Sequence, residues 1–348
     1  MTAAWAGLAI GIVFGAAGRL SGFCLMSGLR GWWVEDDGRL IRSFALALAV
    51  AVVGSQALNF AGPLDLGRSH YMQASFSPLL IFAGGTLFGF GMVMANGCGA
   101  RALVLLGGGN LRSLVVLLCL GVAGHVTLTG LLAPLRVSAG GLLALDMGIS
   151  PPSLPGLLGA AGLPGPAALW LPVLAISGGL AAFALLHEPF RRSVSMILGG
   201  LTVGLLVTAG WYATGVLSAD DFDPVPLASL TFIAPIGDTI LYAMLFTGTA
   251  LGFGVAVVAG IVAGSFVTAL ANRSLALEGF SSPRSMLRYM GGGALMGVGG
   301  ALALGCSIGQ GLTGLSTMAL TAFFAAGGIL AGAAAALRGP LRLGQPTP

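Results

Sequence analysis

The chain has 348 residues, of which 56% are hydrophobic and only 7% are charged, and its mean hydropathy is +0.98. Soluble domains carry roughly a quarter charged residues, so this composition excludes an ordinary soluble globular protein. The net charge of +4 comes from scattered loop residues, which excludes the basic patch that a nucleic-acid partner would need.

The apolar stretches predict helices that cross a lipid bilayer. A bilayer core about 30 Å thick requires about 20 apolar residues per helix, so this length predicts roughly eight to ten spans in a single all-α membrane domain, 1–348. No basic residue precedes the first apolar run, so no signal peptide is expected. The predicted spans lie near residues 4–18, 42–61, 77–96, 112–134, 168–187, 194–216, 239–270, 288–305 and 313–337.

Two segments depart from the pattern of one span each. The run 239–270 is longer than one span needs, so it is either a tilted or kinked helix or two shorter helices. The Gly/Pro-rich stretch 135–167 would interrupt any spanning helix, which predicts a linker between a first half, 1–134, and a second half, 168–348. Its prolines are Pro151, Pro152, Pro155, Pro164 and Pro166.

Charged residues near the spans predict how the second half is oriented. The loops 187–192 and 272–288 are basic, and the loop between them is acidic. The positive-inside tendency places the basic loops in the cytoplasm and the acidic loop outside. Arg338 and Arg342 predict a cytoplasmic C-terminus for a multi-pass protein of the cell inner (plasma) membrane, whereas the loop 19–42 mixes both signs and is ambiguous. The acidic residues are Asp220, Asp221 and Asp223.

An internal repeat appears when Cys98 is aligned with Cys306. Eight of the fifteen residues in 84–98 are identical to their counterparts in 292–306. Transporters are often built from two related halves, with the substrate site where interrupted helices meet near the bilayer midplane. The repeat therefore predicts two pseudo-repeated halves. The identical pairs are Gly84/Gly292, Gly85/Gly293, Leu87/Leu295, Gly89/Gly297, Gly91/Gly299, Ala95/Ala303, Gly97/Gly305 and Cys98/Cys306.

Three of the four cysteines, Cys24, Cys98 and Cys306, lie where an apolar run meets glycine. A backbone broken at membrane depth must be buried in protein or line a cavity, because lipid offers no hydrogen bonds. We therefore expect broken or re-entrant helices that meet at a central pathway lined by these three cysteines. Cys119 lies in a continuous apolar run and is expected to be an ordinary buried cysteine. All four cysteines are expected to be free thiols, since their spacing is not that of a disulfide framework.

These cysteine motifs resemble those of the YeeE/YedE sulfur-transport family, in the same order and at similar separations, over most of the chain. The resemblance implies a transporter, not an enzyme, that imports thiosulfate or a related small sulfur anion. It also implies a small cytoplasmic TusA-like sulfur carrier as a partner. The insert 135–167 and Cys119 do not match the family. The motifs are Gly18-Arg19-Leu20-Ser21-Gly22-Phe23-Cys24, Asn96-Gly97-Cys98-Gly99 and Gly305-Cys306-Ser307-Ile308-Gly309-Gln310-Gly311.

The chemistry of the thiols fits an anion as substrate. Apolar surroundings and a nearby anion disfavour the thiolate, so neutral thiols are expected to donate S–H hydrogen bonds to it. Stripping water from one ionic charge costs on the order of 20 kcal/mol, whereas a neutral hydrogen bond contributes roughly 0.5–1.5 kcal/mol. Backbone amides, helix N-termini and nearby side chains must therefore help, without a metal or other cofactor. The supporting candidates are Arg19, Gly97, Gly99, Arg101, Gly305, Ser307 and Gln310.

Other functions remain open. Family relatives are proposed for selenium compounds as well as for sulfur compounds. Three thiolates would suit a soft metal such as Cu(I) or Zn(II), but no Cys-x-x-Cys occurs and His70, His125 and His187 are scattered. A membrane thiol enzyme that takes up sulfane sulfur would need an activating base, and none lies close in sequence. A scaffold without a pathway would not need the broken Gly-Cys segments.

Asp238 is the acidic residue close to an apolar run that could couple protons to transport. We expect instead that it caps a helix N-terminus beside the external loop, which is the commoner role.

Overall fold

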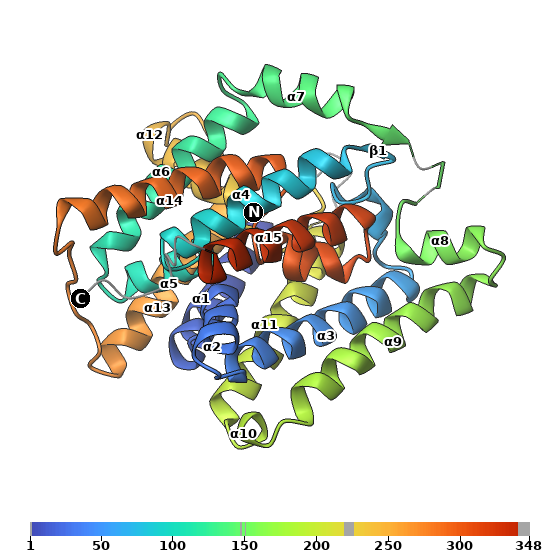
Figure 1. The fold of residues 1–348 in the computed structure, drawn as a ribbon, viewed down its shortest axis with the longest axis horizontal. Coiled ribbons are helices and arrows are strands. Elements are labelled where there is room, and N and C mark those ends of the chain that lie inside the picture. Colours follow the sequence, from blue (N-terminus) through green and yellow to red (C-terminus); the bar gives the residue numbers. More distant parts are fainter. Residues whose placement is uncertain (1, 147, 150, 219–225, 340–348) are drawn as a thin grey trace.

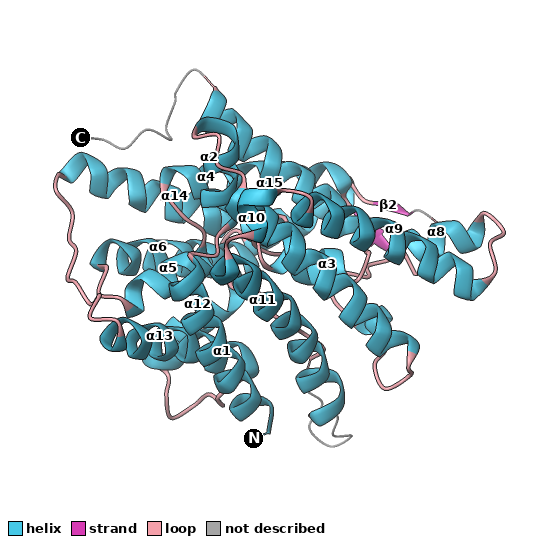
Figure 2. Cartoon of the chain, turned by 90° about the horizontal axis from the view of Figure 1, so that it is seen from below, coloured by secondary structure: helices cyan, strands magenta, loops and turns pink. Residues whose placement is uncertain are grey.

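The computed structural model describes residues 2–146, 148–149, 151–218 and 226–339. In this part of the chain the regular structure is almost entirely helical (Figure 2), apart from the antiparallel pair β1 (Ser75–Phe76) and β2 (Leu145–Asp146). Eight helical segments among the described residues are long and apolar enough to cross a membrane. The predicted all-α polytopic membrane fold is confirmed. Asp220, Asp221, Asp223 and Arg342, which entered the orientation argument, lie outside the described residues.

The helices begin where the sequence supplies caps. Ser77, Asn110 and Ser282 each accept a hydrogen bond from a backbone N–H of the first turn that follows, which satisfies one of the amides a helix start leaves open. The helices before residue 130 are α1 (Thr2–Ser21), α2 (Leu25–Val34), α3 (Arg39–Phe60), α4 (Pro78–Met94), α5 (Gly99–Gly107) and α6 (Leu111–Leu128). Those that follow are α7 (Ala133–Leu142), α8 (Leu154–Ala160), α9 (Gly165–Leu185), α10 (Glu188–Arg191), α11 (Val194–Tyr212), α12 (Ile233–Met244), α13 (Phe253–Ala271), α14 (Pro283–Leu302) and α15 (Leu320–Arg338).

Three predicted spans have different bounds in the structure. The run 239–270 is two helices, α12 and α13, separated by residues 245–252. The stretch predicted near 313–337 becomes a spanning helix only at Leu320, because residues 309–314 form the short π-helix η3. The span predicted over 112–134 ends at Leu128.

The Gly/Pro-rich stretch 135–167 contains structure of its own: most of α7, strand β2, α8 and the start of α9. Pro155 and Pro166 occupy first turns, where a missing N–H costs nothing. The N–H of Leu154 donates to Met318 O at 2.9 Å, and that of Leu320 donates to Pro152 O at 3.1 Å. The stretch is therefore fixed against the segment between η3 and α15. Its role as a linker between two halves stays a prediction.

Helices α4 and α14 cross at the centre of the molecule, with α15 beside them (Figure 1). Glycines permit this approach: a Cβ atom placed on Gly91 would lie 2.7 Å from Gly292 O, and one on Gly292 would lie 2.8 Å from Gly91 O. In the same way Gly85 meets the backbone of α15, and Gly293 meets that of α6. The relation of the two halves by an internal repeat stays a prediction.

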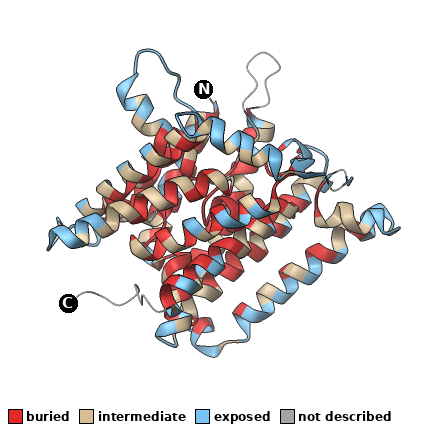
Figure 3. Ribbon diagram, turned by 45° about the horizontal axis from the view of Figure 1, so that its top comes forward, coloured by how far each residue is buried: buried red, intermediate tan, exposed pale blue. Residues whose placement is uncertain are grey.

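The buried residues concentrate in the interior, and the outer helices carry exposed residues along their length (Figure 3). Many of the exposed side chains are large and apolar. In water such a surface would drive association, whereas in a bilayer it faces lipid. Examples are Leu171 and Leu174 on α9, Leu198 and Leu205 on α11, and Val267 and Leu270 on α13.

Basic residues of the first half lie beside the basic loop that follows α13. The guanidinium of Arg19 donates to Ser274 O at 2.8 Å, and that of Arg112 donates to Gly279 O at 2.5 Å. The side chain of Asn110 donates to Glu278 at 2.6 Å. The loop 19–42, whose sequence is ambiguous, therefore begins on the same side of the molecule as residues 274–279.

Candidate functional site

Each of the three motif cysteines lies at a break between helices, as predicted. Cys24 immediately precedes α2, Cys98 immediately precedes α5, and Cys306 lies between α14 and η3. The three breaks share one backbone feature: the residue two positions before the cysteine is left-handed, with φ of 67° at Gly22, 55° at Asn96 and 60° at Leu304. A positive φ is unusual for residues other than glycine, and costly for leucine. The backbone therefore leaves the preceding helix with a left-handed residue at the same position before all three cysteines.

The breaks converge on one buried region. Only 3% of Cys24, 2% of Cys98 and 1% of Cys306 is exposed, and all four cysteines are free thiols as predicted. The side chains of Cys24 and Cys98 lie within hydrogen-bonding reach of each other, and Cys98 also lies beside Ser307, the residue after Cys306. The thiols of Cys24 and Cys98 are therefore neighbours, and the segment that carries Cys306 reaches Cys98 through Ser307.

Cys119 is not part of this group. It is partly exposed on α6, where its Cβ faces Gly293 of α14. Its position agrees with the ordinary packing role expected from the sequence.

Side chains hold the irregular segment around Cys306 in place. The thiol sulfur accepts the N–H of Gly309 at 3.2 Å, the side-chain amide of Gln310 donates to Ala303 O at 2.6 Å, and the hydroxyl of Thr313 donates to Leu230 O at 2.7 Å. Backbone groups freed by a break at membrane depth must find partners within the protein. These contacts provide them and fix the position of the thiol.

Three polar atoms near Cys306 are buried and have no hydrogen-bond partner among the described residues: Ser307 Oγ, Gln310 Oε1 and Tyr71 Oη. Ser307 lies next to Cys98, but the pair does not have the geometry of a hydrogen bond. A buried unsatisfied group costs about 1–3 kcal/mol, so such groups are rare without a reason. Ser307 and Gln310 belong to the segment that carries Cys306, and Tyr71 lies near it.

The positive end of α5 is directed at the cysteines, and Arg101 lies in its first turn. Its guanidinium donates to Gly22 O at 3.4 Å, in the break that carries Cys24. Neither Cys24 nor Cys98 makes a side-chain capping bond, so first-turn amides of α2 and α5 stay open toward the thiols. Arg101 and these amides provide positive potential without an added cation.

Arg19 lies away from the three cysteines, and its role in supporting the site stays a prediction. Its guanidinium binds Ser274 and lies against Gly108, beyond the far end of α5. Cys98 is at the opposite end of this helix, roughly 15 Å away at the rise of an α-helix. The short motif around Cys24 placed Arg19 close in sequence, but α1 ends at Ser21 and the chain turns away.

The remaining supporting candidates lie close to the breaks. Gly97 packs against the Arg101 side chain, and Gly99 meets Ile236 and Leu120. Gly305 adopts a φ of 159° and faces Gln310.

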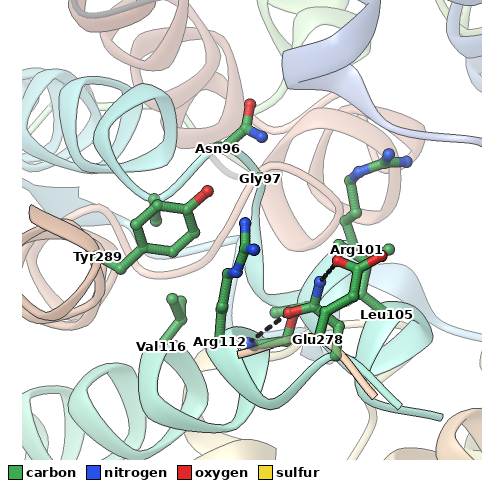
Figure 4. Close-up of a pocket in the computed structure, with 12 residues that line it drawn as sticks. Asn96, Gly97, Arg101, Leu105, Arg112, Val116, Glu278 and Tyr289 are labelled. Atoms are coloured by element: carbon green, nitrogen blue, oxygen red, sulfur yellow. Dashed lines mark hydrogen bonds between the residues drawn. The ribbon is translucent and has the colours of Figure 1, made fainter. Parts of the chain in front are cut away.

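A cavity of about 210 Å³ opens on the other side of the Cys98 break. Asn96, Gly97 and Arg101, from the Cys98 break and the first turn of α5, line it together with Arg112 and Glu278 (Figure 4). Glu278 accepts a hydrogen bond from Asn110, which reduces its effect on an incoming anion. The cavity is large enough for a small oxyanion and has two guanidinium groups on its wall.

The prediction that Asp238 caps a helix is wrong. Helix α12 begins at Ile233, because Pro235 is tolerated in a first turn, and this leaves Asp238 inside the helix. Its carboxylate lies 3.3 Å from Nε2 of His125 on α6. Whether this pair couples protons to transport stays open.

The sequence did not single out Tyr71, Arg112 or Glu278. Arg112 follows the Gly107-Gly108-Gly109 run, which marks the return of the chain after the Cys98 break, and this signal could have indicated it. Tyr71 lies in a polar connection between spans, and its sequence context gives no sign that its hydroxyl is buried.

Known proteins resemble this chain over most of its length. The sequence model of the family described as Sulphur transport matches residues 20–335. The chain is 26% identical over 337 residues to the thiosulfate transporter TsuA of Spirochaeta thermophila, covering 92% of this chain and 94% of that protein. It is also 26% identical over 323 residues to the thiosulfate transporter TsuA of Escherichia coli, covering 88% and 86% of the two chains.

Proposed function

The chain belongs to the Sulphur transport family, the family whose YeeE/YedE motifs its cysteines resemble, and we propose that it imports thiosulfate or a related small sulfur anion across the inner membrane. Its role is then transport and not catalysis. A selenium compound, a soft metal ion and a thiol enzyme that handles sulfane sulfur are the alternatives.

One observation carries this proposal: three breaks from distant parts of the sequence, each at a buried motif cysteine, come together in the interior of the protein. A packing role for cysteine would not require three left-handed turns at matching positions. A row of weak sites does suit a permeating solute, which must leave each site as readily as it enters.

We propose that neutral thiols hold the anion through S–H hydrogen bonds. The thiols are almost fully buried, so a thiolate beside an anion would place two negative charges in a region of low polarity. Neutral thiols avoid this repulsion and act as donors. Arg101 and the open amides of α2 and α5 would supply the remaining positive potential.

We propose that the anion meets Cys306 first, then Cys98 and Cys24, and then the cavity beside Arg101. The order follows from neighbours: Cys306 lies near Tyr71, which is in the connection between α3 and α4, and Cys98 adjoins Cys24. The cavity reaches Glu278, in the basic loop assigned to the cytoplasm. With the basic loop in the cytoplasm, this order corresponds to inward transport. The same orientation puts the C-terminus, after Arg338, in the cytoplasm.

The cavity would release the anion on the cytoplasmic side, where a TusA-like sulfur carrier protein is the proposed partner. Such a carrier would approach the surface around Arg112 and Glu278.

The proposal is tested by uptake of labelled thiosulfate into proteoliposomes that contain the purified protein. Sulfate, selenite and copper serve as competitors. Saturable uptake that unlabelled thiosulfate blocks and copper does not is the expected result. Uptake no greater than in empty liposomes would reject thiosulfate transport.

The donor mechanism predicts that Cys306→Ser keeps part of the uptake and that Cys306→Ala keeps less. A hydroxyl also donates a hydrogen bond, although it fits a soft sulfur atom less well. A thiolate that acts as nucleophile or metal ligand would make both variants equally poor, because serine replaces it in neither role. Uptake rates of the two variants at matched abundance distinguish the mechanisms, and a persulfide on Cys306 seen by mass spectrometry during turnover would favour the enzyme alternative.

A further inference from the structure

We propose that the hydroxyl of Tyr71 binds the substrate directly and forms, with the hydroxyl of Ser307, an oxyanion subsite at the Cys306 end of the pathway. This inference rests on the proposed transport function and adds to it a site for the oxygen atoms of the anion.

The ring of Tyr71 is held firmly from several sides. The side chain is fully buried. Its ring packs edge-on against Trp211, with 6.3 Å between centroids, and at a tilt against His70, with 3.8 Å between centroids. Its backbone carbonyl accepts the hydroxyl of Thr321 on α15 at 2.8 Å. The preceding residue, His70, contacts the backbone of Leu304, the left-handed residue of the Cys306 break. Tyr71 is thus fastened to the same break as the thiol.

The hydroxyl itself is the part of Tyr71 that the fold does not use. Its oxygen is buried and has no hydrogen-bond partner among the described residues. Burial raises the pKa of Tyr71 well above its ordinary value. The phenol therefore keeps its proton at physiological pH and remains a hydrogen-bond donor.

Ser307 provides the second donor of the subsite. Its hydroxyl is also buried without a partner among the described residues. Ser307 follows Cys306 in the chain, and its side chain lies beside Cys98. A buried hydroxyl without a partner destabilises the folded protein, and here two of them belong to one region, around the Cys306 break. An anion that accepts from both hydroxyls would remove this cost.

The chemistry of the subsite defines the class of ligand. Hydroxyl groups prefer the hard oxygen atoms of an oxyanion, whereas a thiol tolerates a softer sulfur atom. A site that offers both fits a small sulfur anion with terminal oxygens and a terminal sulfur. An anion such as hydrosulfide, which has no oxygen, would leave both hydroxyls unpaired.

The test is Tyr71→Phe, which removes the hydroxyl and keeps the ring. Loss of one hydrogen bond to a charged group, about 1.5–3 kcal/mol, should raise the KM for thiosulfate roughly 10- to 100-fold, with a smaller change in the maximal rate. The melting temperature of the ligand-free protein should stay the same or rise, because a buried unpaired hydroxyl is removed. Tyr212→Phe is the matched control, since Tyr212 is exposed, and it should leave both quantities unchanged.

Two results would overturn the inference. The first is an unchanged KM for thiosulfate in the Tyr71→Phe variant, measured under conditions in which the wild-type protein transports thiosulfate. The other is a variant that melts at a lower temperature with the wild-type KM, which would give the hydroxyl a structural role. A wild-type protein that takes up no thiosulfate would instead reject the proposed function.

Discussion

Uptake of thiosulfate should fall at least about tenfold when Cys98 is replaced by alanine, at matched abundance in the membrane. Cys98 is the central member of the row: it adjoins Cys24 on one side and Ser307 on the other. Alanine removes the S–H donor, so the anion finds no hydrogen-bond partner at this position. Its passage from Cys306 to Cys24 should then be interrupted. Initial rates of labelled uptake into proteoliposomes measure this effect.

Cys119→Ala is the matched control for this experiment. Cys119 is a free thiol of the same protein, but it lies on α6 away from the row. Its replacement should leave uptake within about twofold of the wild type, because surface substitutions usually have small effects. Normal uptake by Cys98→Ala would contradict the proposed pathway.

A large loss of stability is expected for Gly299→Ala, at the crossing of α4 and α14. A Cβ atom at this position would lie 2.5 Å from the N of Phe88 and 2.6 Å from the carbonyl O of Gly84. Both neighbours are backbone, so no flexible side chain can move aside, and overpacking of this kind costs about 1–3 kcal/mol or more. Because α4 and α14 carry the Cys98 and Cys306 breaks, uptake should fall as well.

Gly179→Ala on α9 provides the comparison. It is the same substitution in a long helix, but no atom lies within 4 Å of the added Cβ. Alanine favours a helix by about 1 kcal/mol over glycine, so this variant should be as stable as the wild type or slightly more stable. Thermal unfolding in detergent compares the two proteins. Equal melting temperatures for Gly299→Ala and Gly179→Ala would show that the crossing is not tightly packed.

Sequence reasoning located the three breaks because their signals are local. A cysteine close to glycine at the end of an apolar run marks a break, and a break in a membrane helix must be enclosed by protein. Cys24, Cys98 and Cys306 could be selected on this basis, and Cys119 could be set aside. The pathway along the thiols stays a proposal. The glycines of the repeat, such as Gly91 and Gly292, could also be identified from the sequence. In the structure these two glycines lie where α4 and α14 approach each other closely.

The sequence was less informative where the outcome depended on neighbours from other segments. It did not decide whether 239–270 forms one helix or two, because a long apolar run has the same composition in either case. It placed Arg19 at the site and Asp238 at a cap, although their partners, Ser274 and His125, come from distant helices.

By itself, the sequence determined that this protein lies in a membrane, that it is helical, and that its chain breaks at three cysteines. Composition, apolar length and local glycine patterns are sufficient for those conclusions, since each depends on residues that are close in the chain. Only the tertiary structure decided that Cys98 adjoins both Cys24 and Ser307, and that the hydroxyl of Tyr71 is buried without a partner among the described residues. The physical reason is that burial and hydrogen-bond satisfaction are properties of packed surroundings, which the neighbouring residues in the chain do not specify.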